Sequence, residues 1–147
     1  MKLKKRSSIL VVDDQAGIRA ALESLLDREF TVYSAGNAWE AVLASWRLDL
    51  DVALIDLSMP KLANSDALRW IRKSGAALLL TSVSGLPQGG MDQLAGLGIY
   101  GFISKPWDNE VLRCLVRAAA AQRRWERCRG LFAEIQEVPA AWVWTGS

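Results

Sequence analysis

The stretch VALIDLSMP, residues 52–60, decides the fold of this 147-residue chain. Its four leading apolar residues, without a polar interruption, predict a strand that is buried on both faces of a sheet. The run ends on Asp56, and Pro60 then stops the extended chain. A carboxylate at the mouth of a buried strand costs free energy unless a cation or hydrogen bonds compensate it. Asp56 therefore requires partners from elsewhere in the chain.

The composition is that of one ordinary domain, because 51% of the residues are hydrophobic. A net charge of +2 is too small to indicate an acidic partner, and nucleic-acid binding is not expected. The apolar runs are far shorter than the roughly 18 residues of a membrane span, and too short for a secretion signal. Histidine is absent, and Cys114 and Cys128 lack metal-ligand spacing, which excludes histidine-based acid–base chemistry and zinc sites that use histidine. We expect a cytoplasmic protein.

Apolar runs alternate with helical patterns along the whole chain. The predicted strands are 8–12, 30–34, 52–56, 76–80 and 99–103. The predicted helices are 15–28, 37–46, 65–73, a weak helix 91–97, and a long helix from Asp108 to about Glu137. Asn37 is the expected N-cap of the second helix, and Ser74-Gly75 ends the third. This alternation predicts an α/β domain with a mainly parallel sheet.

Several tryptophans lie within these predicted helices. Trp39 and Trp46 share one helical face with apolar neighbours, and Trp70 lies in the following helix. We interpret these three as core or half-buried packing residues. Trp107, which follows the fifth strand, is also interpreted as a packing residue.

Polar residues stand where four of the apolar strands stop. They are Asp13 and Asp14, Asp56, Thr81, and Lys105. Ligands of parallel sheets bind beyond the carboxyl ends of the strands, so these side chains are expected to meet. Three carboxylates without histidine suit Mg²⁺ or Mn²⁺, and they would repel one another strongly without a metal. With a hydroxyl and a lysine, the site could hold a phosphoryl group, and a carboxylate could accept it as an aspartyl-phosphate.

This constellation resembles the receiver domain of two-component response regulators. The matching residues are Asp13-Asp14, Asp56 followed by Met59-Pro60, Thr81, and Lys105-Pro106, and the resemblance covers residues 8 to about 121. It implies a flavodoxin-like (βα)5 fold, a doubly wound parallel five-stranded sheet of order 2-1-3-4-5. We expect a receiver domain over 1–121 and a C-terminal helix extension, linker or dimerisation segment over 122–147.

The resemblance also implies a role for each site residue. Asp56 would be the phosphoacceptor, taking phosphate from a histidine of a sensor kinase or phosphotransfer protein. Asp14, Asp56 and the backbone carbonyl of Ser58 would bind Mg²⁺ directly, and Asp13 would contribute mainly through water. Lys105 would pair with Asp56 at rest and with the phosphoryl group afterwards. Such a protein is a signalling phosphoacceptor rather than an enzyme.

Switching in this family implies two further residues. Thr81 would be drawn toward the phosphoryl group, and Phe102 stands where the family usually has a tyrosine. The signal would leave through the face built from the fourth strand, the helix 91–97, the fifth strand and the last helix. The Lys105–Pro106 bond is expected to be cis. Ala63-Asn64 replaces the usual Asp-Gly after Pro60, where asparagine tolerates the positive φ that glycine serves.

The last helix carries two apolar series. Val111, Leu112, Leu115, Val116 and Ala119 are expected to face the sheet. Cys114, Ala118, Ala121, Trp125, Cys128, Phe132 and Ile135 follow the spacing of a heptad seam. The seam indicates either a homodimer or signalling helix, or a tail that folds back on its own domain. The six arginines between Arg113 and Arg129 are interpreted as solvated faces of this helix.

Two other functions compete with a phosphorylated receiver. A phosphatase resembling the haloacid-dehalogenase family would also use an aspartyl nucleophile, but it needs a second Asp where this chain has Ser58. A pseudo-receiver would be an interaction module that works without phosphorylation. Ala63-Asn64 and Phe102, which depart from the usual family residues, favour this hypothesis.

Overall fold

A computed structural model describes residues 6–60, 66–82 and 95–135, with side chains as far as residue 129. Several predictions lie outside this part of the chain. They concern the loop 82–90 from residue 83, the beginning of helix 91–97, the Ala63-Asn64 turn, the side chains of Phe132 and Ile135, and the last residues of the long helix.

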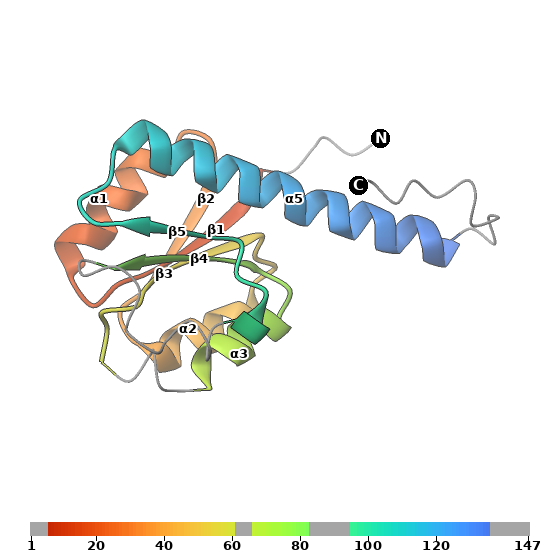
Figure 1. Cartoon of the computed structure of the whole chain (residues 1–147), viewed down its shortest axis with the longest axis horizontal. Coiled ribbons are helices and arrows are strands. Elements are labelled where there is room, and N and C mark those ends of the chain that lie inside the picture. Colours follow the sequence, from red (N-terminus) through yellow and green to blue (C-terminus); the bar gives the residue numbers. More distant parts are fainter. Residues whose placement is uncertain (1–5, 61–65, 83–94, 136–147) are drawn as a thin grey trace.

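Within the described residues, five parallel strands form one sheet of order β2-β1-β3-β4-β5 (Figure 1). The strands are β1 (Ser8–Val12), β2 (Thr31–Ala35), β3 (Val52–Asp56), β4 (Ala77–Ser82) and β5 (Gly101–Ser104). Every residue of β1 and β3 is buried, as their uninterrupted apolar runs predict. The expected flavodoxin-like fold and its strand order are confirmed, with strand bounds shifted by no more than two residues.

Helices cover both faces of this sheet (Figure 1). α1 (Ala16–Leu26) and α5 (Asn109–Ile135) lie on one face, and α2 (Ala38–Arg47) and α3 (Ala67–Lys73) lie on the other. A short 3-10 helix, η1 (Ala95–Leu97), precedes β5. Each face has its own apolar core: Leu22 and Val116 belong to the first, and Leu68 and Ile71 to the second. No described helix is both long enough and apolar enough to cross a membrane.

The helix ends follow the capping rules that the sequence indicated. The Asn37 side chain accepts a hydrogen bond from the Glu40 N–H at 2.8 Å, and Asp108 accepts from the N–H of Glu110 at 2.9 Å. Gly75 follows α3 with φ of +106°, a conformation that favours glycine. An added Cβ at Gly75 would also meet the guanidinium of Arg123 from α5.

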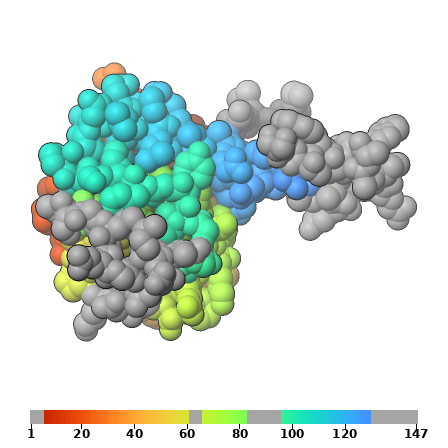
Figure 2. All heavy atoms as spheres, in the orientation of Figure 1, coloured from red at the N-terminus to blue at the C-terminus, as the bar shows by residue number. Residues whose placement is uncertain are grey.

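α5 continues well past the sheet, and Figure 2 shows it leaving the body of the domain on one side. Its inner stripe is confirmed for Leu112, Val116 and Ala119, which are fully buried. The prediction for Val111 is wrong, because this side chain is 57% exposed at the start of the helix.

The outer helices correct the interpretation of three tryptophans. Trp39 is 69% exposed, Trp46 54% and Trp70 48%, so none belongs to the core, and half-burial describes only the last two. The buried residues of α2 are the small Ala41 and Ser45, which bring the helix close to the sheet and leave the larger rings outside.

Candidate functional site

The polar residues predicted at the strand ends meet at one edge of the sheet. Asp13 follows β1, Asp56 is the last residue of β3, and Lys105 follows β5. Thr81 lies inside β4, one residue before its end, rather than after the strand as expected. It is nevertheless directly beside Asp56 in the strand register. The parallel arrangement thus places four separate segments around one point.

Three carboxylates cluster at this edge. One oxygen from each of Asp13, Asp14 and Asp56 lies within 4.8 Å of the other two. Asp13 and Asp56 are only 2% and 3% exposed, whereas Asp14 is exposed. Like charges at this separation repel strongly when water is largely excluded. The cluster therefore opens to solvent on the Asp14 side and requires positive charge.

Lys105 supplies part of that charge. Its Nζ lies 2.9 Å from Asp13 Oδ2 and 3.2 Å from Asp56 Oδ2. Burial of the ammonium disfavours its charge, but the hydrogen bonds to Asp13 and Asp56 and the attraction of both carboxylates outweigh this, so the pKa of Lys105 is raised. The expected pairing with Asp56 is present, and Asp13 is a closer partner. One lysine against three carboxylates leaves the cluster with a surplus of negative charge.

Main-chain groups hold the two buried carboxylates in place. Asp13 Oδ1 accepts from the Gln15 N–H at 2.9 Å, and Asp56 Oδ1 accepts from the Ser58 N–H at 2.9 Å. In both residues Oδ1 is thus bound by the following turn, while Oδ2 faces Lys105. Arg19 donates to the Asp13 carbonyl oxygen at 2.7 Å. The helical pattern gave no sign of this arginine contact, because it depends on how α1 packs beside the site.

The donor chemistry of the cluster fits a hard divalent cation. Mg²⁺ prefers carboxylate, carbonyl and water oxygens, and the cluster offers three carboxylates without nitrogen or sulfur ligands. The exposed Asp14 leaves one side open to solvent, where a magnesium ion would keep its water ligands.

The residues expected to act as a switch lie beside the cluster. Thr81 is 3% exposed. Phe102 lies opposite Leu80 in the register of β4 and β5 and is partly buried against the core beneath α2 and α3. The Lys105–Pro106 bond is cis, as expected. Trp107 packs on the opposite core, as predicted, and its ring centroid lies 5.9 Å from Lys105 Nζ.

A third buried carboxylate lies at the opposite, amino-terminal edge of the sheet. Asp51 is 4% exposed, and its Oδ2 accepts from the Ser8 N–H at 2.9 Å. Arg127 of α5 lies 3.2 Å from Asp51 Oδ1, within ion-pair distance but not aligned as a hydrogen bond, and 2.6 Å from Asp49 Oδ1. Arg117 of α5 likewise pairs with Glu29. These two arginines connect α5 to the domain. Arg117 is exposed, as the interpretation of the arginines as solvated faces predicted, whereas Arg127 is partly buried, so that interpretation is wrong for Arg127.

Comparison with known proteins identifies the class. Residues 9–117 match the family model of the response regulator receiver domain, and the chain belongs to this family. It is 35% identical over 118 residues to the hydrogenase transcriptional regulatory protein HoxA of Cupriavidus necator, covering 78% of this chain and 24% of HoxA. It is 32% identical over 117 residues to the nitrate/nitrite response regulator protein NarP of Escherichia coli, covering 76% of this chain and 54% of NarP.

Solved structures agree with the fold. The signal receiver domain of an HD domain-containing protein from Pseudomonas fluorescens Pf-5 superposes with a TM-score of 0.77 at 24% identity, covering 88% of this chain and 97% of that one. The chain spans about a quarter of HoxA and about half of NarP, so the complete activity of those regulators extends beyond the matched part.

Proposed function

We propose that this chain is a phosphorylation-controlled receiver in which Asp56 accepts a phosphoryl group from a histidine of a sensor kinase or phosphotransfer protein. The observation that carries the proposal is the unbalanced cluster, with three carboxylates within 4.8 Å of one another and Lys105 as the cation bound to two of them. Family membership supports it. The protein would act in the cytoplasm as a signalling phosphoacceptor.

The geometry suits transfer to Asp56. A carboxylate oxygen of Asp56 attacks phosphorus, the P–N bond to the donor imidazole breaks, and its electron pair returns to the ring nitrogen. The Ser58 N–H holds Asp56 Oδ1, which fixes the direction of the carboxylate. Lys105, already beside Asp56 Oδ2, neutralises the oxygens of the transferred group, and Thr81 donates its hydroxyl to them. Such catalysis is positioning and charge neutralisation.

Mg²⁺ is the proposed metal. Asp14, Asp56 and the backbone carbonyl of Ser58 would hold it directly, with Asp13 contributing through water. When bound, it supplies the positive charge that one lysine does not provide and so lowers the repulsion felt by an incoming phosphoryl group. This assignment rests on the oxygen-only donor set and on the surplus negative charge.

The readout is proposed to start at Thr81 and Phe102. Thr81 directly follows Leu80, and Leu80 is the register partner of Phe102 in the neighbouring strand. Movement of Thr81 toward the phosphoryl group would therefore change the packing of Phe102. The signal would leave through the face of β4, β5 and α5. Residues 1–121 would be the receiver, and 122–147 would transmit or stabilise the output.

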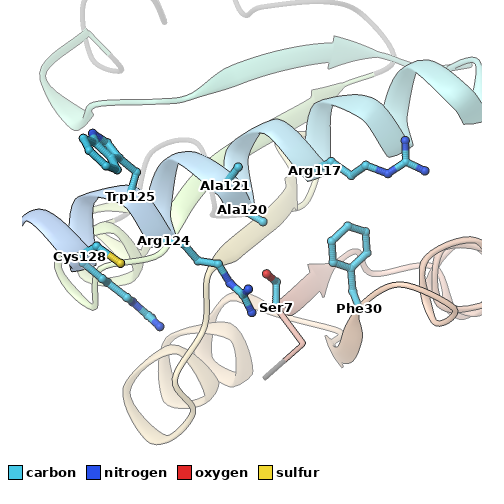
Figure 3. A pocket seen from close by; sticks show the side chains of 9 residues that line it. Ser7, Phe30, Arg117, Ala120, Ala121, Arg124, Trp125 and Cys128 are labelled. Atoms are coloured by element: carbon cyan, nitrogen blue, oxygen red, sulfur yellow. The ribbon is translucent and has the colours of Figure 1, made fainter. Parts of the chain in front are cut away.

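A homodimer through α5 is the proposed output assembly. The heptad residues Cys114, Ala118, Ala121, Trp125 and Cys128 are all exposed. Three of them, Ala121, Trp125 and Cys128, also line a groove of about 610 Å³ with Ser7 and Phe30 (Figure 3). Arg117 and Arg127 fasten the helix to the domain, so the seam is presented on a fixed support to a second copy.

Beryllofluoride with Mg²⁺ tests the site and the dimer together. We expect a rise in molar mass by light scattering and a change in tryptophan fluorescence. Both should disappear in Asp56→Asn, whereas Trp107→Phe should only reduce the fluorescence change, because Trp125 on the dimer seam still contributes. Ala118→Glu should abolish the rise in mass but keep the fluorescence change of Trp107. An unchanged signal in the wild type, identical to Asp56→Asn, would contradict the phosphoacceptor proposal and favour a phosphorylation-independent interaction module.

A further inference from the structure

The helices α2 and α3 present three tryptophans outward: Trp39, Trp46 and Trp70. The rings of Trp46 and Trp70 lie edge to face, with centroids 6.2 Å apart and an interplanar angle of 68°. Trp46 Nε1 also donates to the Trp70 carbonyl oxygen at 3.1 Å. These contacts give the rings of Trp46 and Trp70 a defined arrangement across the two helices.

Neither the core nor the phosphoacceptor site accounts for these tryptophans. α2 and α3, which carry the rings, cover the sheet face opposite α1 and α5 (Figure 1). Large aromatic side chains gathered on a surface are typical of protein interfaces, where tryptophan is enriched among the residues that carry the binding energy. The arrangement therefore indicates a surface that a partner covers.

The charges around the rings are mainly positive. Arg47 follows Trp46, and Arg69 and Lys73 lie on either side of Trp70 in α3; all three cations are exposed. Lys73 Nζ lies 5.3 Å from the centroid of the Trp70 ring. None of the three forms an ion pair with another residue in the described part of the chain. Two acidic residues belong to the same helices. The Glu40 carboxylate accepts a hydrogen bond from the Gly36 N–H, and Asp66 is the N-cap residue of α3.

We propose that this aromatic face (Trp39, Trp46 and Trp70 with Arg47, Arg69 and Lys73) binds an acidic amphipathic helix of a partner protein. Apolar side chains of the helix would pack on the rings, and its carboxylates would meet the three cations. A second copy fits poorly, because a self-complementary contact would place like charges against each other. The proposal is independent of Asp56 and of phosphorylation.

A lipid surface fits the same residues less well. Tryptophan at a membrane interface places its ring in the apolar region and its N–H among the polar head groups. The Trp46 N–H is already bonded inside the protein, and its ring is held against Trp70. The Trp46 N–H is therefore not available to lipid head groups.

The test titrates the full chain, observed through its indole N–H signals in nuclear magnetic resonance, with two synthetic helical peptides. Both carry leucine and phenylalanine at helical spacing; one has glutamate and the other lysine at every remaining position. We expect the acidic peptide to shift the signals of Trp39, Trp46 and Trp70 and to bind at least tenfold more tightly than the basic peptide. The double variant Arg69→Glu/Lys73→Glu should weaken acidic-peptide binding at least tenfold.

Two variants locate the contact. Trp39→Ser removes the most exposed ring without touching the core and should weaken binding, whereas Trp125→Ser on α5 should leave it unchanged. The proposal would be overturned by equal affinity for both peptides or by shifts confined to Trp107 and Trp125. It would also be overturned if phosphatidylglycerol vesicles, titrated in the same way, produced shifts and neither peptide did. Because the readout does not involve Asp56, Asp56→Asn should bind the acidic peptide as the wild type does.

Discussion

The two edges of the sheet each bury an aspartate beside a cation from a distant part of the chain, but the charge balance differs. At the carboxyl edge, Lys105 faces the buried Asp13 and Asp56, with Asp14 nearby. At the amino edge, the single buried Asp51 is matched by Arg127 and by the Ser8 N–H.

This difference separates a binding site from a structural contact. The amino edge is close to neutral once Asp49 is screened by water, and its arginine fastens a helix to the domain. The carboxyl edge keeps excess negative charge, which destabilises the fold unless a further cation binds. Repulsion among the clustered carboxylates is therefore expected at a site where a bound cation relieves it.

Removing the lysine is expected to have the largest effect on stability. Lys105→Met leaves Asp13 and Asp56 buried without their cation and should lower the free energy of unfolding by about 3 kcal/mol, measured by urea denaturation. Millimolar Mg²⁺ should restore part of this loss, because a ligand that binds only the folded state stabilises it. A loss that Mg²⁺ leaves untouched would show that the cluster does not hold the metal.

Removing the arginine at the other edge should cost less. Arg127→Met leaves Asp51 with its hydrogen bond from the Ser8 N–H, so we expect a loss of about 1 kcal/mol in the same denaturation experiment. Mg²⁺ should not restore it. If Arg127→Met and Lys105→Met responded alike to Mg²⁺, the distinction between the two edges would fail.

The smallest effect is expected at Glu29. The hydrogen bond from Arg117 lowers the pKa of the Glu29 carboxyl; burial opposes this, and the attraction of Arg117 and Arg113 adds to the lowering. A lowered pKa stabilises the fold above the unfolded value of 4.5, and this contribution disappears as the pH falls through the folded value. The stability difference between wild type and Glu29→Gln should therefore vanish in acid and shrink in high salt.

The sequence predicted the carboxyl edge well because one physical rule covers it. Polar residues after buried parallel strands must meet at the same edge, which correctly placed Asp13, Asp56 and Lys105 together. The amino edge was not predicted, because the pairing of Arg127 with Asp51 joins residues 76 positions apart through the path of α5. Helical periodicity alone contains no information on that path.

The tryptophans of α2 were misjudged for a related reason. Trp39 and Trp46 share a helical face with Val42 and Leu43, and such a face normally points inward. Here Ala41 and Ser45 take the inner side, since small residues allow the helix to approach the sheet closely. Ring size and hydrophobicity did not reveal which side the sheet would occupy.

The most direct test of the unbalanced edge is intact-mass spectrometry after incubation with acetyl phosphate. The account predicts that one phosphoryl group is added when Mg²⁺ is present, that chelation of Mg²⁺ prevents it, and that Asp56→Asn abolishes it. Asp51→Asn, which changes the buried aspartate of the balanced edge, should still be phosphorylated. A wild-type protein that remains unmodified with Mg²⁺, or an Asp56→Asn variant that is modified as fully as the wild type, would contradict the assignment of Asp56 as the phosphoacceptor.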